Sequence, residues 1–181
     1  VRFNTIAETR DVLAEKPNIV VIATGGVPRE LTIEGGEYSK SIWEIFETND
    51  LVGDLLIFDD RGDHHAAVAA EVAQSRGAKV TIATPDRTPV FELGPTNYAV
   101  AMRSLYRIGT EFRPDTDLVL ICSTENRLKA RLRNTLTGGL DDVVFDRIFH
   151  ETGTEPNDAL FFDLRSHSLN DGELDISSVA K

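Results

Sequence analysis

The stretch from Asp54 to Asp86 reads DLLIFDDRGDHHAAVAAEVAQSRGAKVTIATPD, and it decides the fold. Its apolar run Leu55–Phe58 predicts a buried strand, and the polar residues 59–63 that follow predict a tight turn. The alanine-rich segment Ala66–Ala73 predicts a helix, and the β-branched run Lys79–Ala83 predicts a second strand. Strand, turn, helix and strand within about thirty residues make one βαβ unit, which is typical of nucleotide-binding folds.

The turn of this unit departs from the dinucleotide-binding fingerprint. A pyrophosphate turn has the pattern GxGxxG, because glycines let the backbone approach the phosphates closely. Here Gly62 stands almost alone, and Asp59, Asp60 and Asp63 put negative charge where a pyrophosphate would lie. Like charges in a confined site are costly. The pattern therefore indicates a Rossmann-like fold with a poor or altered nucleotide site.

Length and composition exclude several classes of function. The chain has 181 residues, of which 41% are hydrophobic, and a formal net charge of −11. This length suffices for one domain or two small, closely joined ones. The acidity argues against binding to nucleic acid or to an anionic membrane surface, and no apolar run is long enough to predict a membrane span. The N-terminus lacks a signal-peptide pattern, so we expect a cytoplasmic protein.

Further elements are predicted on both sides of the βαβ unit. The run Ile19–Ala23 predicts a strand covered on both faces, and Trp43, the only tryptophan, is expected to anchor the following connection to the core. A helix is predicted over residues 96–108. Three later strands joined by tight turns predict an antiparallel meander. These strands cover residues 118–122, 128–133 and 142–150.

Two segments resemble motifs of a known family. Residues 23–28 read ATGGVP, similar to the "ATGxxP" closing turn of flavoproteins with two dinucleotide-binding domains. Residues 146–157 read DRIFHETGTEPN, similar to the second "D-x-V-x-x-x-G-x-x-P-N" segment of that group. The chain resembles the C-terminal region of the NADH:flavin oxidoreductase, or Old Yellow Enzyme-like, multidomain family. That family includes trimethylamine dehydrogenase, N-methylproline demethylase and 2,4-dienoyl-CoA reductase. Residues 56–60 in place of a glycine-rich turn most resemble the amine dehydrogenase and demethylase branch.

This resemblance implies a fold and a division into domains. The fold is α/β, with a Rossmann-like βαβ core, an antiparallel meander, a three-layer arrangement and part of a second nucleotide-type domain. Residues 1–50 correspond to part of the flavin-type domain with its ATGxxP turn. Residues 51–147 correspond to an inserted pyridine-nucleotide-type domain, and residues 148–181 correspond to the return into a truncated flavin-type domain.

The resemblance also implies cofactors and a partner outside this chain. In the family, an FMN-bearing barrel and a four-cysteine 4Fe-4S site precede this region. The chain has a single cysteine, Cys122, and no barrel, so we expect a fragment of an FMN-dependent oxidoreductase whose partner is the N-terminal barrel of the parent. The barrel would oxidise an amine or reduce an enone or enoyl thioester. We expect the chain itself to carry no FMN, iron or flavin colour.

The first group of candidate binding residues is Thr24, Gly25 and Gly26. In the family, this turn lets the backbone approach an ADP moiety, so ADP or NAD(P)H is the candidate ligand. The alternative is that the glycines only form a tight turn that requires a positive φ.

The second group is Asp60, Arg61, Gly62 and His64, at the position of the phosphate turn. Arg61 is a candidate phosphate ligand, and a protonated His64 would assist it. The alternative, which the neighbouring carboxylates favour, is a solvated turn in which Asp63 caps the following helix.

Two other groups of residues are interpreted without a ligand. His64 and His65 are not expected to bind a metal, because adjacent side chains diverge and no third ligand is evident from the sequence. The basic residues of 127–133 alternate with apolar ones, which predicts a solvated strand face that at most docks an acidic partner.

Three functional hypotheses remain from the sequence. The leading one is a degenerate nucleotide-binding-type domain within an FMN-dependent oxidoreductase. The alternative is a non-catalytic interaction or scaffold domain that has lost nucleotide binding. A complete small NAD(P)H-dependent reductase is disfavoured, because no catalytic constellation is evident in the sequence.

Overall fold

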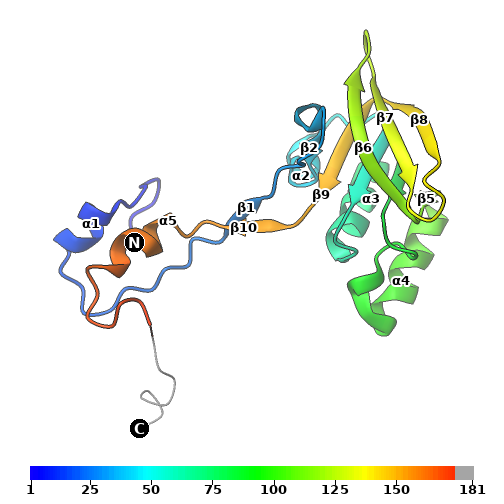
Figure 1. Cartoon of the computed structure of the whole chain (residues 1–181). Coiled ribbons are helices and arrows are strands. Elements are labelled where there is room, and N and C mark those ends of the chain that lie inside the picture. Colours follow the sequence, from blue (N-terminus) through cyan, green and yellow to red (C-terminus); the bar gives the residue numbers. More distant parts are fainter. Residues whose placement is uncertain (174–181) are drawn as a thin grey trace. The chain divides into compact units, whose positions relative to one another are not determined.

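The computed structural model describes residues 1–173, which form two compact units (Figure 1). The larger unit comprises Pro28–Thr154, and the smaller one combines Val1–Val27 with the chain from Glu155 onward. No helix among the described residues is long and apolar enough to cross a membrane.

A five-stranded parallel sheet is the centre of the larger unit. Its strand order is β2-β9-β3-β4-β5, and the central strand β3 (Gly53–Asp59) pairs with β4 (Ala78–Ala83) and β9 (Arg147–Glu151). The outer strands are β2 (Lys40–Ser41) and β5 (Glu111–Arg113). Helix α3 (His64–Ser75) connects β3 to β4, so the predicted βαβ unit is confirmed.

An antiparallel meander forms the second sheet of this unit. It consists of β6 (Thr116–Ser123), β7 (Leu128–Asn134) and β8 (Leu140–Phe145), as the alternating pattern predicts. The prediction of one strand over residues 142–150 is wrong, because β8 ends at Phe145 and β9 then enters the parallel sheet. Asp146 makes this corner, where its Oδ2 accepts the backbone N–H of Asp54 at 2.7 Å.

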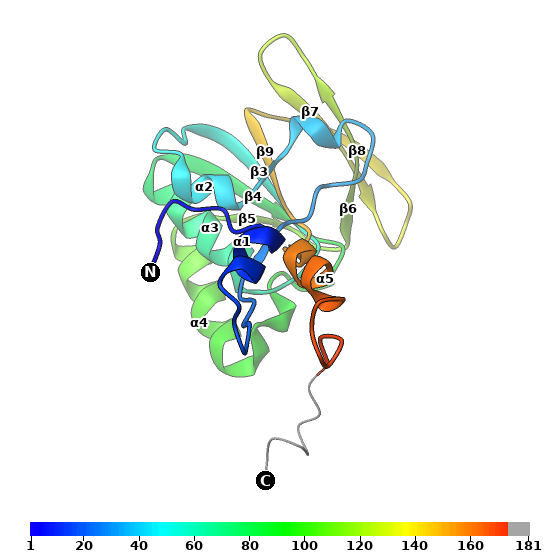
Figure 2. The same cartoon turned by 90° about the vertical axis from the view of Figure 1, so that its left-hand side faces the viewer.

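Alternate residues of β3 face two different cores. Leu55 and Ile57 lie in one apolar cluster with the buried alanines of α3, whereas Leu56 and Phe58 lie in another with side chains of the meander. The helical side also carries α2 (Trp43–Glu47) and α4 (Gly94–Arg107). The result is three layers in this unit, with helices, parallel sheet and meander in that order (Figure 2). The apolar run of β3 is explained by this burial on both faces.

Trp43 does not anchor its segment to the core, contrary to the prediction. Its side chain is 43% exposed, whereas Ile42 and Ile45 are fully buried. Residues three apart share one face of a helix, so the two isoleucines take the buried side of this short helix and leave Trp43 toward solvent.

The smaller unit contains helices α1 (Thr9–Ala14) and α5 (Ala159–Arg165), which contact each other. Strands β1 (Gly26–Pro28) and β10 (Thr154–Pro156) pair where the chain passes between the units. The predicted buried strand at Ile19–Ala23 is wrong. Its residues are not in a strand, and Ile19 and Val21 are 82% and 84% exposed. The physical reason is that no strand among the described residues pairs with this segment, and an apolar run forms a buried strand only when neighbours cover it.

Candidate functional site

The candidate site is the turn between β3 and α3. Strand β3 ends at Asp59 and α3 begins at His64, so Asp60, Arg61 and Gly62 lie at the carboxyl end of a parallel strand. In open α/β sheets, ligands bind at this end of the strands. Four of the residues singled out from the sequence therefore come together here.

The carboxylate of Asp59 takes the place that a phosphate normally has at such a turn. Its side chain is fully buried, and its Oδ1 accepts the backbone N–H groups of Arg61 at 3.1 Å and Gly62 at 2.9 Å. Backbone N–H groups at such a turn are the donors that phosphate-binding loops direct toward their ligand. The carboxylate of the protein itself therefore occupies the donors that an anionic ligand would need.

The burial of Asp59 changes its acidity. Burial raises the pKa of Asp59 to about 6, although the two backbone hydrogen bonds act in the opposite direction. The negative charges of Asp63 and Glu151 raise this pKa further. The second oxygen, Oδ2, is buried and has no hydrogen-bond partner among residues 1–173.

Glu151 is a second buried carboxylate at this turn. It is the partner of Asp59 in the β3–β9 pairing, and its carbonyl accepts the N–H of Asp60 at 3.0 Å. Its Oε1 accepts the N–H of Gly153 at 2.8 Å, and burial raises its pKa. Neither Asp59 nor Glu151 is among the candidate site residues that the sequence predicts. For Asp59, the sequence signal is a carboxylate directly after the apolar run of β3. Glu151 lies at this turn only because β9 pairs with β3.

The segment before α4 lies against the other side of the turn. Gly62 has φ +65°, and its carbonyl accepts the N–H of Glu92 at 2.8 Å. A Cβ at Gly62 would lie 2.9 Å from Asp86 Oδ2 and 3.4 Å from the backbone nitrogen of Phe91. Glycine is therefore required here by conformation and by space, and its neighbours restrict the approach of a ligand.

Asp60 and Arg61 have separate surroundings. Asp60 lines a cavity of about 480 Å³ together with Phe58, Arg29 and Asp117, among others. Partial burial raises the pKa of Asp60, and repulsion from Asp117 adds to this effect. Arg61 extends its side chain beside Gly153, where an added Cβ would lie 3.4 Å from Arg61 Cδ.

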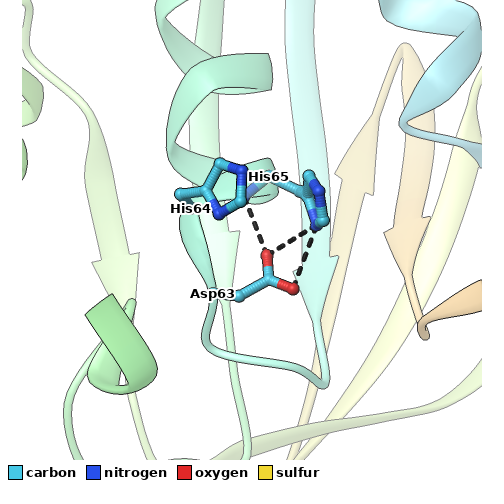
Figure 3. Close-up of side chains that lie close together, drawn as sticks. All are labelled: Asp63, His64 and His65. Carbon is cyan, nitrogen blue, oxygen red and sulfur yellow. Dashed lines mark hydrogen bonds and ion pairs between the residues drawn. The ribbon is translucent and has the colours of Figure 1, made fainter. Parts of the chain in front are cut away.

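The start of α3 is capped by Asp63, as predicted. Its Oδ1 accepts the backbone N–H of His65 at 2.8 Å, and its Oδ2 lies 3.0 Å from His65 Nδ1 (Figure 3). The expectation that the rings of His64 and His65 diverge is wrong, because their centroids lie 4.2 Å apart. The reason is that the capping carboxylate also holds the ring of His65, which turns it back toward the start of the helix.

Thr24, Gly25 and Gly26 lie in the other unit. The hydroxyl of Thr24 donates to the carbonyl of Asn157, and the N–H of Asn157 donates to the carbonyl of Gly25 at 2.9 Å. The two motif segments that carry the family resemblance are therefore hydrogen-bonded to each other. Gly25 has φ +68°, and no atom of residues 1–173 lies within 4 Å of an added Cβ, so conformation rather than crowding favours glycine there.

The basic residues of β7 are paired with carboxylates on neighbouring strands. Arg131 binds both oxygens of Asp142 at 2.7 and 2.9 Å, and Lys129 lies 3.5 Å from the same carboxylate. Arg133 binds Asp117 at 2.6 Å. Each of these basic side chains has a carboxylate partner, which supports the interpretation of this surface as a solvated strand face.

Comparison with individual known proteins identifies relatives of the chain, although no family model matches it. The chain is 38% identical over 174 residues to a probable N-methylproline demethylase of Rhizobium meliloti (strain 1021). It is 31% identical over 183 residues to a multifunctional alkene reductase/demethylase of Caballeronia cordobensis. These alignments cover 95% and 99% of the chain.

The chain is homologous to one region of the Old Yellow Enzyme-like multidomain family. It spans only 26% and 27% of the length of the two relatives. A third member of the set, an N,N-dimethylglycine/sarcosine dehydrogenase of Chromohalobacter salexigens, is 30% identical over 98% of the chain and 27% of its own length.

Solved structures confirm the predicted Rossmann-like fold of this Old Yellow Enzyme-like region. Histamine dehydrogenase from Rhizobium sp. 4-9 matches 92% of the chain with a TM-score of 0.79 and 18% identity, over 27% of its own chain. A 6-hydroxypseudooxynicotine amine oxidase from Pseudomonas geniculata N1 matches 93% of the chain with a TM-score of 0.81 and 20% identity, over 26% of its own chain. Thioredoxin reductase from T. acidophilum matches 76% of the chain with a TM-score of 0.61 and 13% identity, over 44% of its own chain.

Proposed function

We propose that this chain is the dinucleotide-binding-type region of a flavin-dependent oxidoreductase of the demethylase and amine dehydrogenase branch, and that its β3–α3 turn no longer holds a pyrophosphate. The homology to two demethylases and a dehydrogenase supports the first part. FMN and a 4Fe-4S cluster would lie in parts of the parent outside this chain and would carry out its redox chemistry.

One observation carries the second part of the proposal, namely the hydrogen bonds from Arg61 and Gly62 to Asp59. A pyrophosphate at this turn would have to displace an intramolecular carboxylate from these donors. It would also approach the negative charges of Asp63 and Glu151. Because the donors are already satisfied and the charges are of the same sign as the ligand, the turn favours the protein's own carboxylate.

The same observation favours a second candidate function, a non-catalytic interaction domain. The smaller unit offers a contact segment for that role, since Ile19, Val20 and Val21 are apolar and 44–84% exposed. In the parent, we propose that this segment pairs with chain beyond the present residues. In both candidate functions, this region supports other domains of a parent protein. The two functions differ in whether that parent is an FMN-dependent oxidoreductase.

Calorimetric titration of the chain with NADH, NADPH, ADP and FAD tests the closed turn. We expect no binding of NADH or NADPH tighter than about 1 mM, equivalent to about −4 kcal/mol. Replacing Asp59 by glycine frees both backbone donors and removes one charge, so Asp59→Gly is expected to gain affinity for ADP. Asp50→Asn, which changes an exposed carboxylate, serves as the matched control.

Three outcomes of these titrations are decisive. Micromolar binding of NADH to the unaltered chain would refute the closed turn. Binding of ADP that is lost in Gly25→Ala would place a nucleotide at the ATGxxP turn of the smaller unit, leaving the β3–α3 turn closed. An Asp59→Gly variant that folds, as judged by circular dichroism, yet gains nothing would show that Asp59 is not what closes the turn.

The assignment to a flavin-dependent parent has a separate test. We expect the full-length protein to show FMN and iron–sulfur absorbance, and the present chain to show neither. Flavin absorbance in the purified chain would contradict this division of labour. A full-length protein without flavin would favour the interaction domain.

A further inference from the structure

Three potential metal ligands converge at the start of α3. The side chains of Asp63, His64 and His65 each offer one ligand atom, and these atoms lie within 4.8 Å of one another (Figure 3). His65 Nδ1 lies 2.9 Å from Asp63 Oδ1 and 3.0 Å from Oδ2. The two imidazole rings lie 4.2 Å apart, so both reach the same side of the helix start.

The charge around this helix start suits a cation. The negative charge of Asp63 repels two buried carboxylates beside the turn, Asp59 at the end of β3 and Glu151 at the end of β9. Asp59 Oδ2 in addition lacks a hydrogen-bond partner among the described residues. A helix N-terminus by itself disfavours a cation, because the macrodipole is positive there. The nearby carboxylates offset that effect.

We propose that Asp63, His64 and His65 form a binding site for a borderline divalent cation of the Zn²⁺ class. Imidazole nitrogen together with one carboxylate oxygen suits Zn²⁺, Ni²⁺ or Cu²⁺, whereas Mg²⁺ and Ca²⁺ require mainly oxygen ligands. Zinc–ligand bonds are about 2.0–2.2 Å long, which puts two ligand atoms of a tetrahedral site about 3.4 Å apart. Ligand atoms that now lie up to 4.8 Å apart must therefore approach one another by about an ångström. His64 and His65 are exposed, which leaves their side chains free to make this adjustment.

At the turn where nucleotide-binding folds bind an anion, this site would bind a cation instead. A metal would join the capping carboxylate of α3 to the first two side chains of the helix. It would thereby fix the start of α3 and reduce the repulsion among the carboxylates of the turn. The expected consequence is a metal-dependent increase in the thermal stability of the larger unit, because any ligand that binds only the folded state stabilises it.

The first experiment is calorimetric titration of the metal-free chain with ZnCl₂. We expect a single Zn²⁺ per chain, with binding weakened by about tenfold or more in His64→Gln and in His65→Gln. Asp63→Asn is the most informative variant, because asparagine still caps a helix but carries no charge, so it should weaken zinc binding while α3 persists. His167→Gln removes a histidine of the smaller unit and should leave binding unchanged.

The second readout is the unfolding temperature of the larger unit, followed by the fluorescence of Trp43. Zn²⁺ should raise it in the unaltered chain and in His167→Gln, and should not raise it in the double variant His64→Gln/His65→Gln. Zinc binding that survives this double variant would overturn the site, as would the absence of any zinc binding to the unaltered chain. Neither outcome bears on the nucleotide titrations, so failure of this site is distinguishable from failure of the proposed function.

Discussion

Replacing Asp59 by asparagine should change how the stability of the larger unit depends on pH. The pKa of Asp59 is about 6 in the folded protein, whereas the ordinary pKa of an aspartate, which applies to the unfolded chain, is 3.8. The folded state therefore binds the proton more tightly than the unfolded state does. The stabilisation from protonated Asp59 is therefore complete below pH 3.8 and is lost as the pH rises through 6. The difference between the two pKa values corresponds to about 3 kcal/mol.

The asparagine side chain retains the oxygen that accepts from Arg61 and Gly62 and removes the charge. Asp59→Asn should therefore resemble the unaltered chain near pH 4 and exceed its free energy of unfolding by up to about 3 kcal/mol near pH 8. Urea unfolding at a series of pH values, followed by the fluorescence of Trp43, measures this difference. Asp50→Asn is the control. A difference that stays constant from pH 4 to pH 8 would refute the assignment of a raised pKa to Asp59.

Two further predictions test the local geometry. Gly62→Ala should destabilise the larger unit by about 1–3 kcal/mol, because alanine strains a φ of +65° and its Cβ would meet Asp86 Oδ2 at 2.9 Å. In chemical denaturation, Gly138→Ala should cost less, since its φ is also positive but no atom of the described residues lies within 4 Å of an added Cβ. The hydrogen bonds from Arg131 lower the pKa of Asp142 to about 2. In Arg131→Gln, NMR titration should show this pKa rising toward 3.8, and an unchanged value would contradict the pairing.

Local patterning was sufficient to predict the βαβ unit at the centre of the larger unit. The apolar run 55–58 and the alanine-rich segment after it specify a strand and a helix by periodicity, and Asp63 specifies where the helix begins. The order of these elements, together with the ATGxxP and GxxPN segments, identified the family. Such features are encoded by residues close together in the chain, so the sequence contains them directly.

Tertiary structure decided everything that depends on distant segments meeting. The run Ile19–Ala23 has the composition of a buried strand, but no strand among residues 1–173 pairs with it, so its pattern alone gave a wrong prediction. Glu151 reaches the turn only because β9 pairs with β3, a contact between residues some ninety positions apart. The closing of the turn likewise depends on where one oxygen of Asp59 points. Sequence determines the periodicity that forms each element, whereas the burial and repulsion of carboxylates arise only when packing excludes water around them.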